Sequence, residues 1–240
     1  MSSEVGLGRH YSRDERDNKF LTARYLLNRK FPRIRAHRYW NSNRWWGDQG
    51  GTSQCVVYSW AHCIERPNTA ITPWRSEGGH ELSWGSWRFT GQQPLINLDK
   101  AYNWAQRNDE WPGTDYDGTS VRAGAKYLHK HGHIESYTWA YDVYTVVHAV
   151  NTVSPVVAGT LWTIDMFVPD KHGFIEPTGD SVGGHAYLID GVSNRNKFFR
   201  IKNSWGKNWG RGGFARITFD NFDKLLLAHG EACLPIFKAT

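Results

Sequence analysis

The pattern of the sequence changes at about Thr138, and this change limits the folds that the chain can adopt. Before it, apolar residues recur at helical spacing between breaker residues, over 54–66, 98–106 and 120–130. After it, runs rich in β-branched and aromatic residues predict strands over 153–159, 185–192, 198–203 and 213–219. A helical half followed by a strand-rich half predicts an α+β protein with two lobes.

The first 31 residues form a region of different character. They are mostly charged and polar, with one predicted helix over Arg13–Leu27 that Pro32 would end. Part of the net charge of +6 comes from a cluster of basic residues in this region and just after it, namely Arg24, Arg29, Lys30, Arg33, Arg35 and Arg38. We expect a solvated basic arm, or one that docks onto an acidic partner. Nucleic acid is not expected as that partner, because no nucleic-acid module motif accompanies the charge.

The cellular compartment of the protein can be predicted from features that are missing from its sequence. No apolar run approaches the roughly 20 residues of a membrane span, and the N-terminal region carries no secretory leader. An odd, low count of three cysteines favours a reducing compartment. We therefore expect no membrane association and a cytoplasmic location, or carriage inside a virion or another assembly. If Cys55 acts as a thiol, Cys63 and Cys233 are the pair left for a disulfide, and we expect them reduced.

Cys55 has the setting of a nucleophile. It opens a predicted helix after the Gly-rich turn at 47–54, where exposed amides and the helix dipole stabilise a thiolate. Gln49 precedes it by six residues, His185 follows it by 130, and Asn203 follows it by 148. A lone cysteine here would more often be a small buried apolar residue, so its companions decide the interpretation.

The ordered set Gln49, Cys55, Gly-His185-Ala and Asn203-Ser-Trp-Gly, followed by Trp-Gly, resembles the papain-like cysteine peptidases. The resemblance extends over 32–240. It implies a two-lobed α+β fold with a helical lobe at about 45–137, a β lobe at about 138–240, and the active site in the cleft between them.

The resemblance also implies catalytic roles. Cys55 would attack the scissile carbonyl as a thiolate paired with protonated His185, which then protonates the leaving amine. Asn203 would orient the imidazole, and the Gln49 amide would join the Cys55 backbone N–H in an oxyanion hole. The cysteine peptidase so predicted needs no cofactor and no metal. The alternating His129, His131 and His133 are interpreted as a helix C-terminus.

Substrate-binding residues are likewise implied. Trp205 would shield the His–Asn hydrogen bond, with Trp209 beside it. Gly118 would pair with the substrate backbone, while Gly159 and Ala186 would line a roomy pocket for an apolar side chain. Protein or peptide substrates are expected.

The sequence also departs from the family pattern. Val56 stands where Trp usually follows the nucleophile, and Thr52 replaces a disulfide cysteine. Both departures match disulfide-free bacterial and phage members. The 31 N-terminal residues are fewer than a usual inhibitory prosegment, so we expect no full zymogen block. Two alternatives stay open: another acyl transfer at the same site (deamidation, isopeptide cleavage or transpeptidation), or a structural role in an assembly that retains the fold.

Overall fold

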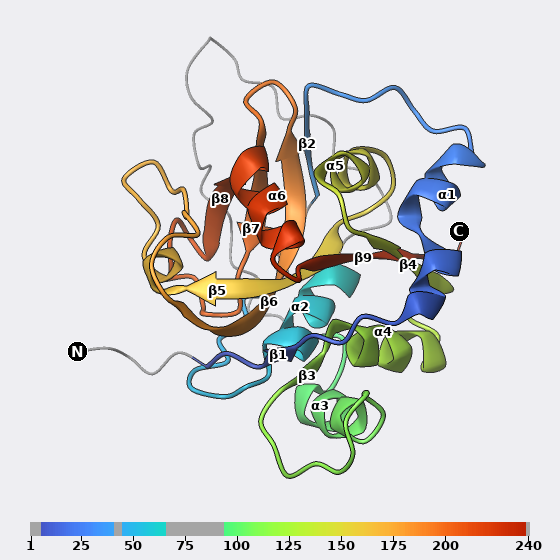
Figure 1. Ribbon diagram of the computed structural model, residues 1–240, viewed down its shortest axis with the longest axis vertical. Helices are drawn as coiled ribbons and strands as arrows, with labels where there is room; N and C mark the ends of the chain where they lie inside the picture. The colour runs from blue at the N-terminus through green and yellow to red at the C-terminus, as the bar shows by residue number, and fades with distance from the viewer. Residues whose placement is uncertain (1–5, 41–44, 66–93, 239–240) are drawn as a thin grey trace.

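A seven-stranded antiparallel sheet forms one half of the molecule, and helices form the other half (Figure 1). The structure is a computed structural model that describes residues 6–40, 45–65 and 94–238. The sheet runs in the order β4-β9-β5-β6-β7-β8, and β2 also pairs with β6. Its strands are β2 (His37–Tyr39), β4 (Ser136–Ala140), β5 (Val156–Thr163), β6 (Ser181–Ser193), β7 (Phe198–Lys202), β8 (Phe214–Thr218) and β9 (Glu231–Ile236).

The helices divide between the two faces of this sheet. Helices α2 (Cys55–Ile64), α3 (Leu98–Gln106) and α4 (Val121–Lys130) form the helical lobe. Helices α5 (Val143–Thr152) and α6 (Phe219–Leu227) pack with the sheet's other face. Two short elements, β1 (Arg9–His10) and β3 (Thr119–Ser120), pair in parallel as a separate two-stranded sheet. The predicted α+β papain-like class is confirmed.

Alternation along the strands builds two separate cores. Val156 and Ala158 of β5 lie in the cluster with α5 and α6, whereas Val157 lies in the cluster with α2 and α4. Successive residues of a strand point to opposite faces, so the same strands are buried from both sides. The strands on which the site depends are therefore held firmly on both faces.

Several predicted elements occur where the pattern placed them. The predicted 98–106 helix coincides with α3, and α4 begins one residue after the predicted start. Asn97 and Ser120 cap these helices by accepting hydrogen bonds from Lys100 N and Ala123 N.

Other elements differ from the prediction. The single helix expected over Arg13–Leu27 is instead a 3-10 helix, η1 (Glu15–Phe20), followed by α1 (Thr22–Leu27), with extended backbone at Leu21 between them. Helix α5 was not predicted, because its valine-rich sequence is typical of a strand. Its Asp142 cap and burial against the sheet override that preference.

Most of the basic residues near the N-terminus, namely Arg24, Arg29, Lys30, Arg33 and Arg35, are exposed, as expected of a solvated group. Arg38 lies on β2 and is buried with its guanidinium over the Trp40 ring, while Arg29 covers Tyr25. A docking partner for the exposed members of the group stays a prediction. Within the described residues, no helix is long and apolar enough to cross a membrane.

The contact of α2 with α4 generates a stability prediction. A Cβ added at Gly124 would lie 2.6 Å from Trp60 Nε1, which donates a hydrogen bond to the Val121 carbonyl at 3.0 Å. We expect Gly124→Ala to lower the free energy of unfolding by about 1–3 kcal/mol, measured by urea denaturation. His129→Ala, at an exposed position of the same helix, should change it by less than about 0.5 kcal/mol. Equal effects would contradict this packing.

Candidate active site

The imidazole of His185 is held in one orientation and one tautomer. Its Nε2 lies 2.7 Å from Asn203 Oδ1, which also accepts the Ser204 backbone N–H at 2.8 Å. Because the Ser204 N–H can only donate, the Asn203 atom is an oxygen, and Nε2 must carry the hydrogen. The other nitrogen, Nδ1, is buried and hydrogen-bonds to none of the described residues. It is left with a free lone pair.

Cys55 is the first residue of α2, and this helix packs against β6, the strand that carries His185. The backbone N–H of Ala186, the residue after His185, hydrogen-bonds toward the thiol. Burial raises the pKa of Cys55 to about 11, against the effect of that hydrogen bond. Burial also lowers the pKa of His185 to about 4, although the Asn203 hydrogen bond opposes this. Both shifts favour uncharged groups, so this state holds a thiol and a neutral imidazole rather than an ion pair.

Aromatic rings enclose the His–Asn pair. The Trp205 ring stacks on His185 with centroids 4.7 Å apart, and Trp209 meets Trp205 edge-on at 5.4 Å. Trp162, which the sequence analysis did not single out, contacts His185 from another side at 4.8 Å. These rings exclude water from a hydrogen bond that would be weaker if solvated.

Gln49 is fixed by the residue that follows Asn203. Its backbone N–H donates to the Ser204 carbonyl at 2.8 Å, and its Oε1 accepts the Ser204 hydroxyl. The Nε2 group is thereby turned away from Ser204, and it donates to the carbonyls of Thr52 and Gly6. The donor expected to serve an oxyanion is therefore occupied by the protein's own N-terminal region.

Residues 6–10, which we name the blocking segment, lie across the site. Gly6 N–H donates to the Gly50 carbonyl at 2.9 Å, and Gly8 N–H donates to the Gly184 carbonyl at 3.2 Å. The Gly8 backbone also acts on Cys55 and opposes the rise in the pKa of that thiol. Side chains at Gly6 or Gly8 would collide with the backbone of 51–53. The expectation of no full block is wrong: these N-terminal residues cover the nucleophile.

The blocking segment is also held by the long side chain of Arg9. Arg9 pairs with Glu231 at 3.0 Å, and both side chains are almost fully buried. A Cβ at Gly159 would lie 2.8 Å from Arg9 Nε. The space beside Gly159 thus holds the Arg9 side chain in this structure, and the expectation that a substrate places an apolar side chain there stays a prediction.

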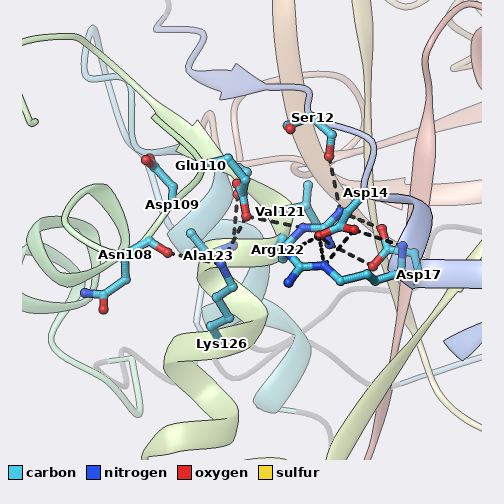
Figure 2. A network of polar contacts seen from close by, with 12 residues as sticks. Ser12, Asp14, Asp17, Asn108, Asp109, Glu110, Val121, Arg122, Ala123 and Lys126 are labelled. Atoms are coloured by element: carbon cyan, nitrogen blue, oxygen red, sulfur yellow. Dashed lines mark hydrogen bonds and ion pairs between the residues drawn. The ribbon is translucent and has the colours of Figure 1, made fainter. Parts of the chain in front are cut away.

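A second anchor follows three to eight residues after Arg9. Figure 2 shows Ser12, Asp14 and Asp17 gathered around the guanidinium of Arg122, with Glu110 also in contact. Arg122 donates to Asp17 Oδ1 at 2.7 Å and to the Ser12 carbonyl at 3.2 Å, and its Nε lies 3.3 Å from Glu110. Arg122 is on α4, so this network fastens the N-terminal region to the helical lobe.

The comparisons with known proteins identify the family. The sequence profile of the papain family cysteine proteases matches residues 76–232, well over half of the chain. The chain belongs to that family. This papain-family match begins after Gln49 and Cys55, so the positions of those two residues in the site are known from the structure and not from the match.

The fold of this papain-family protein is shared with solved proteases. Xylellain, a cysteine protease from Xylella fastidiosa, superposes with a TM-score of 0.69 over 99% of this chain and 98% of that chain, at 16% identity. Digestive procathepsin L2 from Tenebrio molitor gives 0.61 over 98% and 79%, at 17% identity. Macrodontain-1 from Ananas macrodontes is 26% identical over 164 residues, which cover 60% of this chain and 74% of that protein. The protein is a cysteine peptidase of this family.

The predicted pairing of Gly118 with a substrate backbone stays a prediction, since the blocking segment occupies this part of the site. Gly118 does not pair with the segment in the site; its N–H donates to the Tyr102 hydroxyl at 2.7 Å. The neighbouring Thr119 N–H donates instead to the Gly8 carbonyl at 2.8 Å. Gly118 allows the close approach, since a Cβ there would collide with that carbonyl. Sequence reasoning missed Thr119 and Glu231, and nothing in the local sequence around Glu231 indicates that it faces the site.

The structure also shows the state of the cysteines and the position of His131. All three cysteines are free and buried, as expected for Cys63 and Cys233. His131 caps the end of α4 and bonds the Tyr127 carbonyl at 2.8 Å. In the described part of the chain, no group of His, Cys, Asp and Glu could hold a metal ion.

The raised pKa of Cys55 predicts how its rate of reaction with iodoacetamide changes with pH. Because burial raises its pKa to about 11, the thiolate fraction near neutral pH is small, and labelling should rise only toward alkaline pH. Gly8→Val should expel the blocking segment, hydrate the thiol and raise the rate at about pH 7 by roughly tenfold or more. Ala36→Val adds a valine at an exposed position outside the segment and should change nothing. Mass spectrometry of the labelled peptide measures the rate, and identical pH profiles for all three proteins would contradict the blocked state.

Proposed function

We propose that this protein is a latent cysteine peptidase that cleaves peptide bonds at Cys55 once the blocking segment leaves. The observation that carries the proposal is the buried Nδ1 of His185, which hydrogen-bonds to none of the described residues and whose tautomer Asn203 fixes; the backbone N–H of the next residue, Ala186, acts on the Cys55 thiol. An unpaired buried acceptor costs stability, and such groups persist where chemistry uses them.

The first half of the reaction uses this lone pair. His185 Nδ1 takes the proton of the Cys55 thiol, and the sulfur attacks the carbonyl carbon of the substrate. The C=O electron pair moves to oxygen, where the Gln49 Nε2 donor and the Cys55 backbone N–H stabilise the negative charge. As the intermediate collapses, the C–N bond breaks and His185 gives its proton to the departing amine. A thioester to Cys55 remains.

The second half releases the acid. His185, neutral again, takes a proton from water, and the hydroxide attacks the thioester carbon through a second oxyanion at the same donors. The C–S bond then breaks, and the sulfur leaves as thiolate or takes the proton back from His185. Asn203 holds the imidazole in place through both steps.

Three contacts of the blocking segment support latency, because each occupies a group or a space that a substrate would need. The Gly6 carbonyl takes the Gln49 donor, Gly8 covers the thiol, and Arg9 fills the pocket beside Gly159. Protein or peptide chains are the substrates of the opened site.

The catalytic assignment predicts which substitutions abolish hydrolysis in the Gly8→Val chain. Cys55→Ser and His185→Ala should each lower kcat by about 10²–10⁴ or more, and Gln49→Ala by about 10²–10³. Cys63→Ser, on the same helix, should keep activity. Fluorogenic peptide turnover measures the rates, and detection of a new amine terminus rather than ammonia or a ligated product separates hydrolysis from the other acyl transfers. Undiminished turnover in Cys55→Ser would reject the assignment.

The anchor at Arg122 predicts a second route to opening. Asp17→Asn removes the charge that meets this guanidinium, and we expect labelling of Cys55 at neutral pH to rise about tenfold, equivalent to about 1.4 kcal/mol. Glu15→Gln neutralises an exposed carboxylate of the same 3-10 helix and serves as the matched control. Equal labelling of the two variants would show that this network does not hold the segment.

A further inference from the structure

His62 is a fully buried histidine of α2 that the mechanism above does not use, and its neighbours at 60–61 and 63–64 are apolar. Its Nε2 accepts the backbone N–H of Gly47 at 3.2 Å. Because that N–H can only donate, Nε2 carries a lone pair and the ring hydrogen is on Nδ1. Burial and the positive charge of Lys202 hold the pKa of His62 well below its ordinary value, so the ring stays neutral and keeps this acceptor.

Gly47 approaches the helix closely because it has no side chain. A Cβ at this position would lie 2.4 Å from the Trp45 ring and 2.6 Å from the Tyr58 ring. Tyr58 and His62 are four residues apart on the same side of α2, and the Trp45 ring packs on both, with centroids 5.5 and 4.9 Å away. The backbone of Gly47 therefore lies against the helix, within reach of the imidazole.

Residues 45–49, which we name the Gln49 loop, are also fastened to the chain at 202–206, around Asn203. Three hydrogen bonds join the two stretches, from Lys202 Nζ to the Trp45 carbonyl at 2.7 Å, from the Gly206 N–H to the Gly47 carbonyl at 3.0 Å, and from the Gln49 N–H to the Ser204 carbonyl at 2.8 Å. These bonds fix the loop relative to Asn203 and His185, but they do not connect it to the helix that begins with Cys55.

A connection to that helix is what an oxyanion donor needs. The oxyanion forms on the carbon that Cys55 attacks, so the Gln49 amide is useful only at a fixed position relative to α2. Two side chains of α2 hydrogen-bond to the Gln49 loop: Tyr58 makes an exposed bond to a carbonyl of the loop at 3.3 Å, and His62 makes the buried one. The buried bond is protected from water, which would otherwise compete for the same groups.

The other ring nitrogen shows the cost of placing a histidine here. Among the described residues, His62 Nδ1 has no hydrogen-bond partner, although it carries the ring hydrogen. A buried donor without a partner costs stability, and an apolar side chain of similar size would avoid that cost. The bond from Nε2 to the Gln49 loop is what an apolar residue could not supply.

We propose that His62 is a positioning residue for hydrolysis, which holds the Gln49 loop against α2 and so sets the oxyanion donor relative to Cys55. It touches neither the substrate nor the reacting atoms, and it acts through Gly47 and Gln49. The inference rests on the proposed function, because the donor that it concerns belongs to the same site.

The first test compares two replacements of similar size in full-length Gly8→Val protein. In His62→Gln the side-chain oxygen can accept the Gly47 N–H in place of Nε2, whereas His62→Leu has no acceptor. We expect His62→Leu to lower kcat for a fluorogenic peptide by about tenfold or more, and His62→Gln to stay within about threefold of the parent. His129→Leu, at an exposed position of α4, is the matched control and should leave kcat unchanged. Equal kcat for His62→Leu and the parent would overturn the proposal.

Alkylation separates positioning of the donor from damage to the site. Iodoacetamide reacts with the Cys55 thiol by displacement of iodide and forms no oxyanion, so its rate should change by less than about twofold in His62→Leu. In a chain that already carries Gln49→Ala, His62→Leu should lower kcat by less than about twofold more, because no donor is left to position. A parallel loss of alkylation, or a further tenfold loss of kcat, would contradict a role through Gln49.

Hydrogen exchange tests the contact in the latent protein, without any hydrolysis. NMR should show the Gly47 amide exchanging at least about tenfold faster in His62→Leu than in the unsubstituted protein, with slow exchange kept in His62→Gln. Unchanged exchange in His62→Leu would refute the role of His62 even if the protein hydrolyses peptides. Absence of hydrolysis together with fast exchange in His62→Leu would reject the proposed function and keep the hold of His62 on the Gln49 loop.

Discussion

The register of β5 between β6 and β9 is the constraint on which the site depends. It aligns Ala186, Gly159 and Glu231 in one row, and the residue before Ala186 is the imidazole that serves Cys55. A slip of one residue would turn that row to the opposite face of the sheet. Because two hydrophobic cores pack against these strands from both sides, such a slip would also misplace both cores.

Three consecutive residues after β7 complete the chemistry. Asn203 fixes the tautomer of His185, Ser204 holds Gln49 through its backbone carbonyl and its hydroxyl, and Trp205 stacks on the imidazole. One short stretch of backbone thus positions the base, the oxyanion donor and the water-excluding ring together. This arrangement gives a physical reason for the Asn-Ser-Trp order: each side chain serves a different partner from one rigid position.

The covering of Cys55 by the blocking segment and the pKa shifts of Cys55 and His185 both lower the reactivity of the thiol. The blocking segment removes water from Cys55 and His185, and loss of water disfavours the charged forms of both groups. The covered state is therefore inert for two reasons, since the thiol is both inaccessible and protonated. The segment stays in place through backbone hydrogen bonds at its glycines and through buried ion pairs at Arg9 and Arg122.

The sequence by itself determined the α+β class, the family resemblance, strands β5 to β8, helices α2 to α4, and the residues proposed for catalysis. These were accessible because periodicity, capping residues and motif spacing are local properties of the chain. Only the tertiary structure decided that residues 6–10 cover the site, that Thr119 pairs with them in place of Gly118, and that Glu231 faces Arg9. The last pair is separated by 222 positions, and its members meet only because strand pairing brings β9 beside β5. No local pattern encodes such a contact, since it arises from the packing of whole elements.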